Sequence, residues 1–206
     1  MGEKSYKMVK RNAFLETGFA LFSGHGIESV TMQRIADESG YGVATLYRYY
    51  NNKPALVIAI AARKWEEYIS SSLRQQHEDL TAAQSFTNFL DSFVDLYRNH
   101  RDLLRFNQFF NIYVNSESIE AGEMGQYQAA IEMLAERFHL TYEKAKTDHT
   151  LRTDIPEKVI FSTTLHLMLA AATRYAVGLI YTPEDAYDPE TELITLHDAL
   201  LEKYVR

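Results

Sequence analysis

The sequence contains no cysteine, so neither disulfide bonds nor thiolate-ligated metal centres can contribute to this protein. Its 206 residues include only four prolines and nine glycines, which leaves room for long, uninterrupted helices. The longest apolar run, residues 165–172, is interrupted by His166 and is far shorter than the ~20 residues of a membrane-spanning helix. The first residues do not form a hydrophobic signal segment. We therefore expect a cytoplasmic protein that does not contact a membrane.

Charge is unevenly distributed along the chain. The net charge is −7, yet residues 1–53 contain seven Lys/Arg and five Asp/Glu, a net of +2, which leaves −9 for residues 54–206. A polyanionic partner would be repelled by most of such a protein and would have to be bound by its N-terminal quarter. An excess this small also arises by chance, so it supports such a partner only together with a matching motif.

Apolar residues recur at three- and four-residue intervals along most of the chain, which predicts an all-α fold of about nine helices. Residues 1–11 lack this periodicity at their start and are expected to form a frayed arm. The first predicted helix follows this arm and ends at residue 23. The other predicted helices cover residues 31–38, 42–50, 53–76, 81–99, 101–114, 124–147, 156–178 and 190–205. Residues 117–125 and 182–189 are predicted to be connections.

Residues 31–50 have the pattern of two short helices joined by a tight turn. Thr31 is well suited to cap the first helix, and Gly40 suits the left-handed backbone that often ends a helix. Apolar residues then resume with helical spacing at Val43, Leu46 and Tyr50. This pattern is typical of a helix-turn-helix motif.

The same segment resembles the DNA-binding motif of the TetR family of bacterial transcriptional regulators, T-x-x-x-I-A-x-x-x-G-V-S-x-x-T-L-Y-x-Y-F-x-x-K-x-x-L. The matching residues are Thr31, Ile35, Ala36, Gly40, Thr45, Leu46, Tyr47, Tyr49, Lys53 and Leu56. The preceding helix also agrees with the family pattern, at Phe14, Leu15, Gly18, Leu21, Phe22 and Gly26. Two residues depart from it, since Tyr41 replaces a valine and Gly42 replaces the serine that usually caps the second helix. The resemblance implies a helix-turn-helix domain at residues 8–68 and an effector-binding and dimerisation domain at residues 69–206.

In this family the third helix lies in the major groove of double-stranded DNA. Tyr47 and Lys53 match family residues that contact phosphates. Arg48 has the fork of donors that fits guanine, but arginines contact phosphates equally well, and the two roles stay open. The predicted DNA-binding residues are Thr31, Gln33, Gly42, Val43, Ala44, Thr45, Tyr47, Arg48, Tyr49 and Lys53. The competing interpretation is an ordinary helical bundle whose surface happens to carry tyrosine and arginine.

One helix-turn-helix unit reads too few base pairs to be selective in a genome, and pairing about a two-fold axis on a palindromic operator is the common solution. Residues 156–178 are apolar nearly all round, so a helix there must be covered on every side. Family members pair through their last two long helices. We therefore predict a homodimer formed by the last two helices.

The C-terminal half is rich in ring-bearing side chains. Aromatic residues at helical spacing more often form a core than a ligand pocket, but polar residues fall among these rings, as they do in small-molecule sites. The residues predicted to bind an apolar or aromatic effector are Trp65, Tyr68, Phe89, Phe93, Tyr97, Phe109, Tyr113, His166 and Arg174. The resemblance implies a ligand-responsive transcriptional regulator that is usually a repressor released by its effector, although activation by the ligand stays open.

Two other functions compete with this interpretation. Glu136 and His139 have the Glu-x-x-His spacing of di-iron bundles, but the sequence lacks the second copy that such sites need. It also lacks a glycine-rich phosphate loop, an HExxH sequence and a nucleophile elbow. We therefore expect no enzymatic activity, cofactor or metal. A helical adaptor that binds protein partners through its apolar surface remains the main alternative.

Overall fold

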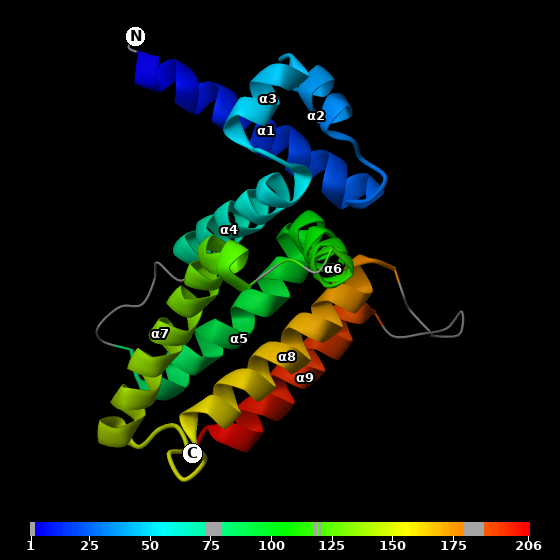
Figure 1. Ribbon diagram of the computed structural model, residues 1–206. Coiled ribbons are helices and arrows are strands. Elements are labelled where there is room, and N and C mark those ends of the chain that lie inside the picture. Colours follow the sequence, from blue (N-terminus) through cyan, green and yellow to red (C-terminus); the bar gives the residue numbers. More distant parts are fainter. Residues whose placement is uncertain (1–2, 73–79, 118, 120, 179–187) are drawn as a thin grey trace. The chain divides into compact units, whose positions relative to one another are not determined.

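The computed structural model describes residues 3–72, 80–117, 119, 121–178 and 188–206. In these residues the regular structure is helical (Figure 1), apart from an isolated antiparallel bridge between Leu151 and Val205. The predicted all-α fold is confirmed. The described helices are α1 (Glu3–His25), α2 (Met32–Glu38), α3 (Val43–Tyr49), α4 (Lys53–Ser72), α5 (Ala82–Asn99), α6 (Arg101–Ser116), the 3₁₀ helix η1 (Ala121–Met124), α7 (Gly125–Asp148), α8 (Glu157–Ala176) and α9 (Pro189–Tyr204). None of them combines the length and the apolar character needed to cross a lipid bilayer.

Most helix boundaries lie close to their predicted positions, and the largest difference is at the start of α1. The predicted frayed arm was wrong, because the helix already begins at Glu3. Residues 3–11 include neither glycine nor proline and therefore favour a helix without any help from burial. The predicted continuation of α4 beyond Ser72 and most of the predicted 182–189 connection lie outside the described residues.

The chain forms two compact units, and each is described by itself. Unit 1 comprises Met1–Glu66 and Arg105–Ala130, and unit 2 comprises Glu67–Leu104 and Ile131–Arg206. Helices α4, α6 and α7 each contribute residues to both units. The predicted boundary at residue 68 separates a DNA-binding domain from an effector-binding domain. It divides the chain by function and not by packing, and it stays a prediction.

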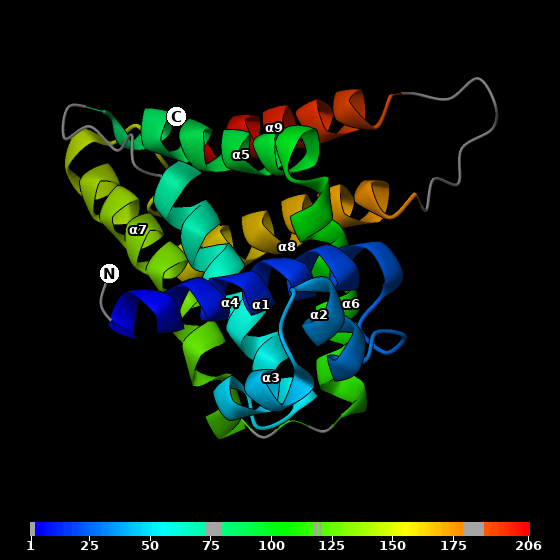
Figure 2. The same ribbon diagram turned by 90° about the horizontal axis from the view of Figure 1, so that it is seen from above.

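Unit 1 is organised around the N-terminal helices. Helix α2 packs against both α1 and α3, as Figure 2 shows from above. Gly18 permits a close approach of α1 to α4, since a Cβ atom at this position would lie 2.7 Å from Cδ1 of Ile60. The residues that form the core of these four helices include Phe14, Phe22, Ile35, Ala36, Leu46 and Leu56, all fully buried.

Unit 2 is built on α5, α8 and α9, which pack against one another (Figure 1). Aromatic rings from α5, α7 and α8 pack against one another in this unit. The end of α7 and the loop after it hold the start of α5, because Asp148 Oδ2 accepts a hydrogen bond from Ala82 N at 2.7 Å and Thr150 Oγ1 accepts one from Ala83 N at 2.9 Å. The carbonyl of Thr150 in turn accepts a hydrogen bond from Arg206 N at 3.0 Å.

Candidate nucleic-acid interface

The helix-turn-helix motif forms as the sequence predicts. Thr31 caps α2, because its side-chain oxygen accepts a hydrogen bond from Arg34 N at 3.1 Å. Gly40 ends the turn after α2 with a left-handed φ of +78°, which glycine adopts without strain. Gly42 is the N-cap of α3 in extended conformation, but it offers no side-chain hydrogen bond. Without the serine, α3 has no side-chain cap, but Gly42 still adopts the extended conformation of an N-cap.

The outer surface of α3 carries most of the side chains predicted to meet DNA. Leu46 and Tyr50, two of the residues whose helical spacing marked this segment, are buried. Tyr49 is half-buried, with its ring centroid 5.8 Å from that of Phe14. The exposed residues of this surface are Gly42, Ala44, Tyr47 and Arg48, and the half-buried ones are Val43, Thr45 and Tyr49.

The two arginines of the motif have different environments. Arg34 Nε donates to Glu38 Oε1 at 2.8 Å, and its Nη2 lies 3.2 Å from His25 Nε2. Arg48 is exposed and makes no hydrogen bond or ion pair with the residues that the structure describes. The Arg48 guanidinium is therefore available to an external partner, whereas that of Arg34 already has partners within the protein.

Other predicted contact residues are engaged with their neighbours. Exposed Gln33 donates from Nε2 to Asp37 Oδ1 at 2.8 Å. Lys53, half-buried at the start of α4, donates from Nζ to the carbonyl of Glu28 at 3.2 Å and lies 5.7 Å from the ring centroid of Tyr113. Burial lowers the pKa of Lys53, although the carboxylates of Glu117 and Glu28 oppose this shift. The ammonium group of Lys53 has three donors and uses one of them here, so it could contact a phosphate and keep its bond to Glu28.

The predicted effector residues are divided between the two units. Trp65, Phe109 and Tyr113 belong to unit 1, and the other six belong to unit 2. Trp65 and Tyr113 are buried, whereas Phe109 is half-buried beside Gly26. Burial raises the pKa of Tyr113 to about 12, and the nearby carboxylates act in the same direction.

In unit 2 the structure brings part of the predicted set together. Phe89 and Phe93 are buried with ring centroids 5.1 Å apart, and buried Tyr97 lies 6.3 Å from Tyr175. The hydroxyl of buried Tyr68 donates to the carbonyl of Ser92. In contrast, His166 and Arg174 lie exposed on α8 and not among these buried rings.

Sequence reasoning missed two aromatic residues of unit 2, of which Phe138 is buried and Phe161 is half-buried. Phe138 of α7 and Phe161 of α8 have ring centroids 5.4 Å apart. Phe89 of α5 completes this cluster, with its centroid 5.6 Å from Phe138 and 6.1 Å from Phe161. Only the helical spacing within each segment could have indicated them, because the three segments are distant in sequence.

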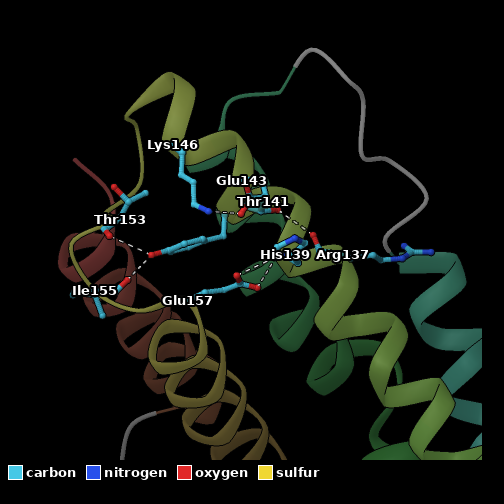
Figure 3. A network of polar contacts seen from close by, with 9 residues as sticks. Arg137, His139, Thr141, Glu143, Lys146, Thr153, Ile155 and Glu157 are labelled. Carbon is cyan, nitrogen blue, oxygen red and sulfur yellow. Dashed lines mark hydrogen bonds and ion pairs between the residues drawn. The ribbon is translucent and has the colours of Figure 1, made fainter.

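A polar network joins α7 to the start of α8 (Figure 3). The sequence suggested His139 as a partner of Glu136, but His139 Nδ1 lies 3.0 and 3.2 Å from the two carboxylate oxygens of Glu157. Potential ligand atoms of His139, Glu143 and Glu157 lie within 4.8 Å of one another, yet Glu143 also forms an ion pair with Lys146. In the described residues these side chains form a polar network at the protein surface, in which His139 faces Glu157 and not Glu136.

Comparison with known proteins agrees with the motif and with the fold. The profile of the family described as "Bacterial regulatory proteins, tetR family" matches residues 14–60. An HTH-type transcriptional regulator of Staphylococcus aureus is 27% identical over 145 residues, which cover 69% of this chain and 71% of the relative. The HTH-type transcriptional repressor KstR of Mycobacterium tuberculosis is 25% identical over 167 residues, or 81% of this chain and 73% of the relative.

Solved structures share the fold over nearly the whole chain. The transcriptional regulator FadR of Bacillus subtilis, in complex with stearoyl-CoA, superposes with a TM-score of 0.70 at 14% identity, covering 92% of this chain and 95% of FadR. Identity at this level supports the fold alone. The motif, its geometry, the matching profile and the regulator relatives together show that this chain belongs to the TetR family of bacterial helix-turn-helix transcriptional regulators.

Proposed function

We propose that this protein is a repressor that binds a palindromic operator as a homodimer and releases it when a small apolar or aromatic molecule binds to its C-terminal half. The observation that carries the proposal is the accessible surface of α3, on which Arg48 is exposed and unbonded within the described residues. An arginine held on a helix without an internal partner can pair with guanine or with phosphate. Membership of a family of transcriptional regulators supports the same function.

On this proposal α3 lies in the major groove. Val43 and Ala44 have no side-chain hydrogen-bonding groups, so they would recognise the methyl groups of thymine. Arg48 would contact a base edge or a phosphate. Tyr47, exposed on the same helix, and Lys53, at the start of α4, would contact the sugar-phosphate backbone and set the register of the protein on the duplex.

The remaining candidates flank α3. The hydroxyl of Thr31 keeps its hydrogen for a phosphate oxygen, because its oxygen is the acceptor in the cap of α2. Gln33 would exchange its bond to Asp37 for one to DNA. A Cβ atom at Gly42 would meet nothing within 4 Å, so the backbone there is open to a phosphate. Thr45 and Tyr49, both half-buried, would border the groove.

Dimerisation through α8 and α9 would provide a second copy of α3, which would bind the other half-site of the operator. Large apolar side chains are exposed on these helices, at Val159 and Leu167 of α8 and Ile194 of α9. An isologous interface uses the same patch on both copies, and burying these side chains against a second copy would remove them from water. The palindromic operator follows from the two-fold symmetry of such a pair.

The aromatic interior of unit 2 is the part of the protein that favours an apolar effector. Phe89, Phe138 and Phe161 come from three helices and offer rings without hydrogen-bonding groups. The relative FadR binds stearoyl-CoA, a ligand with a long apolar acyl chain. By analogy, we propose that the effector of this protein also has a largely apolar body.

Helix α4 would connect effector binding to DNA binding. It is one continuous helix from Lys53 to Ser72, and it carries both the candidate phosphate contact Lys53 and the candidate effector residues Trp65 and Tyr68. A ligand shifts such an equilibrium only by its differential affinity for the two states. The effector would therefore have to favour an arrangement of α4 that does not fit the operator.

The test is DNA binding by the full-length protein to fragments from upstream of its own gene, measured by fluorescence anisotropy. We expect one fragment to bind at least about a thousandfold more tightly than unrelated DNA of equal length. Release of this fragment by an apolar compound, and not by polar charged ones, would support the effector class. If no genomic fragment binds, the protein is better explained as a helical adaptor.

A further inference from the structure

The first three turns of α1 carry basic side chains that are held against both ends of α3. Lys10 Nζ lies 4.2 Å from the ring centroid of Tyr6 and 5.4 Å from that of Tyr41, the residue just before the N-cap of α3. Arg11 Nε donates to the hydroxyl of Tyr50, the C-cap of α3, at 3.4 Å. Two neighbouring cations of α1 are thus anchored to the residues that bracket the recognition helix.

The anchoring depends on a residue at which this chain departs from the family pattern. Tyr41 replaces a valine, and only a ring can attract the ammonium group of Lys10 through its face. The ring of Tyr41 is itself held by Phe14, at a centroid distance of 5.4 Å, and Phe14 is fully buried. The position of Lys10 is therefore tied to the core of unit 1.

The charges of Lys10 and Arg11 are not neutralised by a carboxylate among the described residues. Their partners are rings and a hydroxyl group, which leave the positive charge in place. Two carboxylates of unit 1 already have partners, since Glu16 pairs with Lys64 at 2.6 Å and Glu38 pairs with Arg34 at 2.8 Å.

This part of α1 is open to solvent. Tyr6, Met8 and Val9 are each more than half exposed, and Arg11 is also exposed. In both views the first turns of α1 project beyond α3 (Figure 1, Figure 2). Arg11 is therefore open to a charged ligand, and Lys10, which is half-buried, remains partly accessible to one.

We infer that Lys10 and Arg11 form a second phosphate-binding surface, which contacts the DNA backbone beside the groove that α3 enters. This inference rests on the proposed function and extends the DNA interface beyond the helix-turn-helix motif. Contacts of this kind position a protein on the duplex and carry no base information. They should therefore strengthen binding to all sequences in the same proportion.

The salt dependence of DNA binding tests this inference. We would compare the wild type with K10Q/R11Q and with R105Q/K146Q, which removes the same charge from exposed positions on α6 and α7. Each phosphate contact that is lost should reduce the slope of log K against log salt concentration by about 0.9, or by about 3.6 for four contacts in a dimer. The R105Q/K146Q variant should keep the slope of the wild type, and both variants should unfold at the wild-type temperature within a few degrees.

The outcomes separate this inference from the proposed function. A reduced slope in K10Q/R11Q, with operator and unrelated DNA weakened equally, supports the inference. An unchanged slope in a wild type that binds its operator overturns the inference alone. A wild type that binds no DNA overturns the proposed function as well. The charge-conserving variant K10R/R11K should keep the wild-type slope, and a loss of slope there would mean that the two side chains act through the structure of α1 and not through their charge.

Discussion

The two arginines of the helix-turn-helix motif differ in whether they have bonding partners within the protein. Arg34 is bonded to Glu38 and lies beside His25, whereas Arg48 has no partner among the described residues. A side chain without internal partners can be removed at little cost to stability, since surface substitutions usually change it by less than about 0.5 kcal/mol. Removing the Arg48 side chain should therefore weaken DNA binding without lowering the stability of the protein.

We expect Arg48→Ala to weaken operator binding by ~1–3 kcal/mol per half-site while the unfolding temperature stays unchanged. Anisotropy titrations against operators with single base-pair changes would show the role of the side chain. Loss of discrimination at one position indicates a base contact, and uniform weakening indicates a phosphate contact. Arg105→Ala, at an exposed position on α6, is the control and should bind normally. Wild-type affinity in Arg48→Ala would contradict the proposed orientation of α3.

The raised pKa of the Tyr113 phenol predicts that the folded protein loses stability at alkaline pH. Burial raises its pKa to about 12 in the folded protein, against ~10 in the unfolded chain. The stabilisation is fully present below pH ~10 and is lost as the pH rises towards about 12. Tyr113→Phe has no proton to lose, so its unfolding free energy should fall less between about pH 9 and pH 11, by on the order of 1 kcal/mol.

Chemical denaturation of both proteins across this pH range measures the difference. Lys53 is present in both, so its own titration cancels to a first approximation. Tyr6→Phe, at an exposed position, should follow the wild type. Parallel pH profiles for the wild type and Tyr113→Phe would show that the phenol is not protected as described.

Sequence reasoning succeeded at residues whose role is local. The cap at Thr31, the left-handed Gly40 and the buried Leu46 follow from spacing and residue type within one short segment. It did not find the bond from Lys53 to the carbonyl of Glu28, because 25 residues separate the two. Residue type alone also grouped His166 with the rings, although the side chain lies on the exposed face of α8.

At the scale of the element, α2 shows how one residue can combine two roles. Thr31 caps the helix through its side-chain oxygen, and we propose that the same hydroxyl donates to a phosphate. Serine would keep both functions. Aspartate is an equally good cap but would place a negative charge against the DNA.

Three substitutions of Thr31 therefore separate capping from DNA binding. Thr31→Ala should cost about 1 kcal/mol of stability. Thr31→Asp should keep the stability of the wild type but lose most of its DNA affinity, and Thr31→Ser should keep both. Thermal unfolding and anisotropy titration of the three variants measure the two effects. Full DNA affinity in Thr31→Asp would remove this residue from the proposed interface.

At the scale of the whole molecule, helix periodicity predicted the all-α architecture well, but not how the helices group. Residues 105–130 belong to the same compact unit as the N-terminal helices. A periodic pattern shows that a helix has an apolar face without showing what covers that face. The aromatic cluster of Phe89, Phe138 and Phe161 was hidden for the same reason, since its rings come from three separate segments.

Dimerisation is the prediction that concerns the molecule as a whole. We expect Leu167→Glu, at an exposed apolar position of α8, to convert the dimer to a monomer, because a carboxylate would be buried in the apolar interface. Operator affinity should fall with it. Leu140→Glu, at a still more exposed position on α7, should remain dimeric. Light scattering and sedimentation report the mass directly, and a Leu167→Glu variant that stays dimeric would place the interface elsewhere.

Thr150 links three separate parts of unit 2. Its hydroxyl serves both the first turn of α5 and the carboxylate of Asp148, while its carbonyl secures the backbone of Arg206 just after α9. A substitution at this threonine would remove the hydroxyl bonds to Ala83 N and Asp148, and so loosen the start of α5, while the backbone bond to Arg206 stays. In a genetic screen for altered regulation, substitutions at Thr150 would give a phenotype although the residue belongs to neither of the proposed binding surfaces.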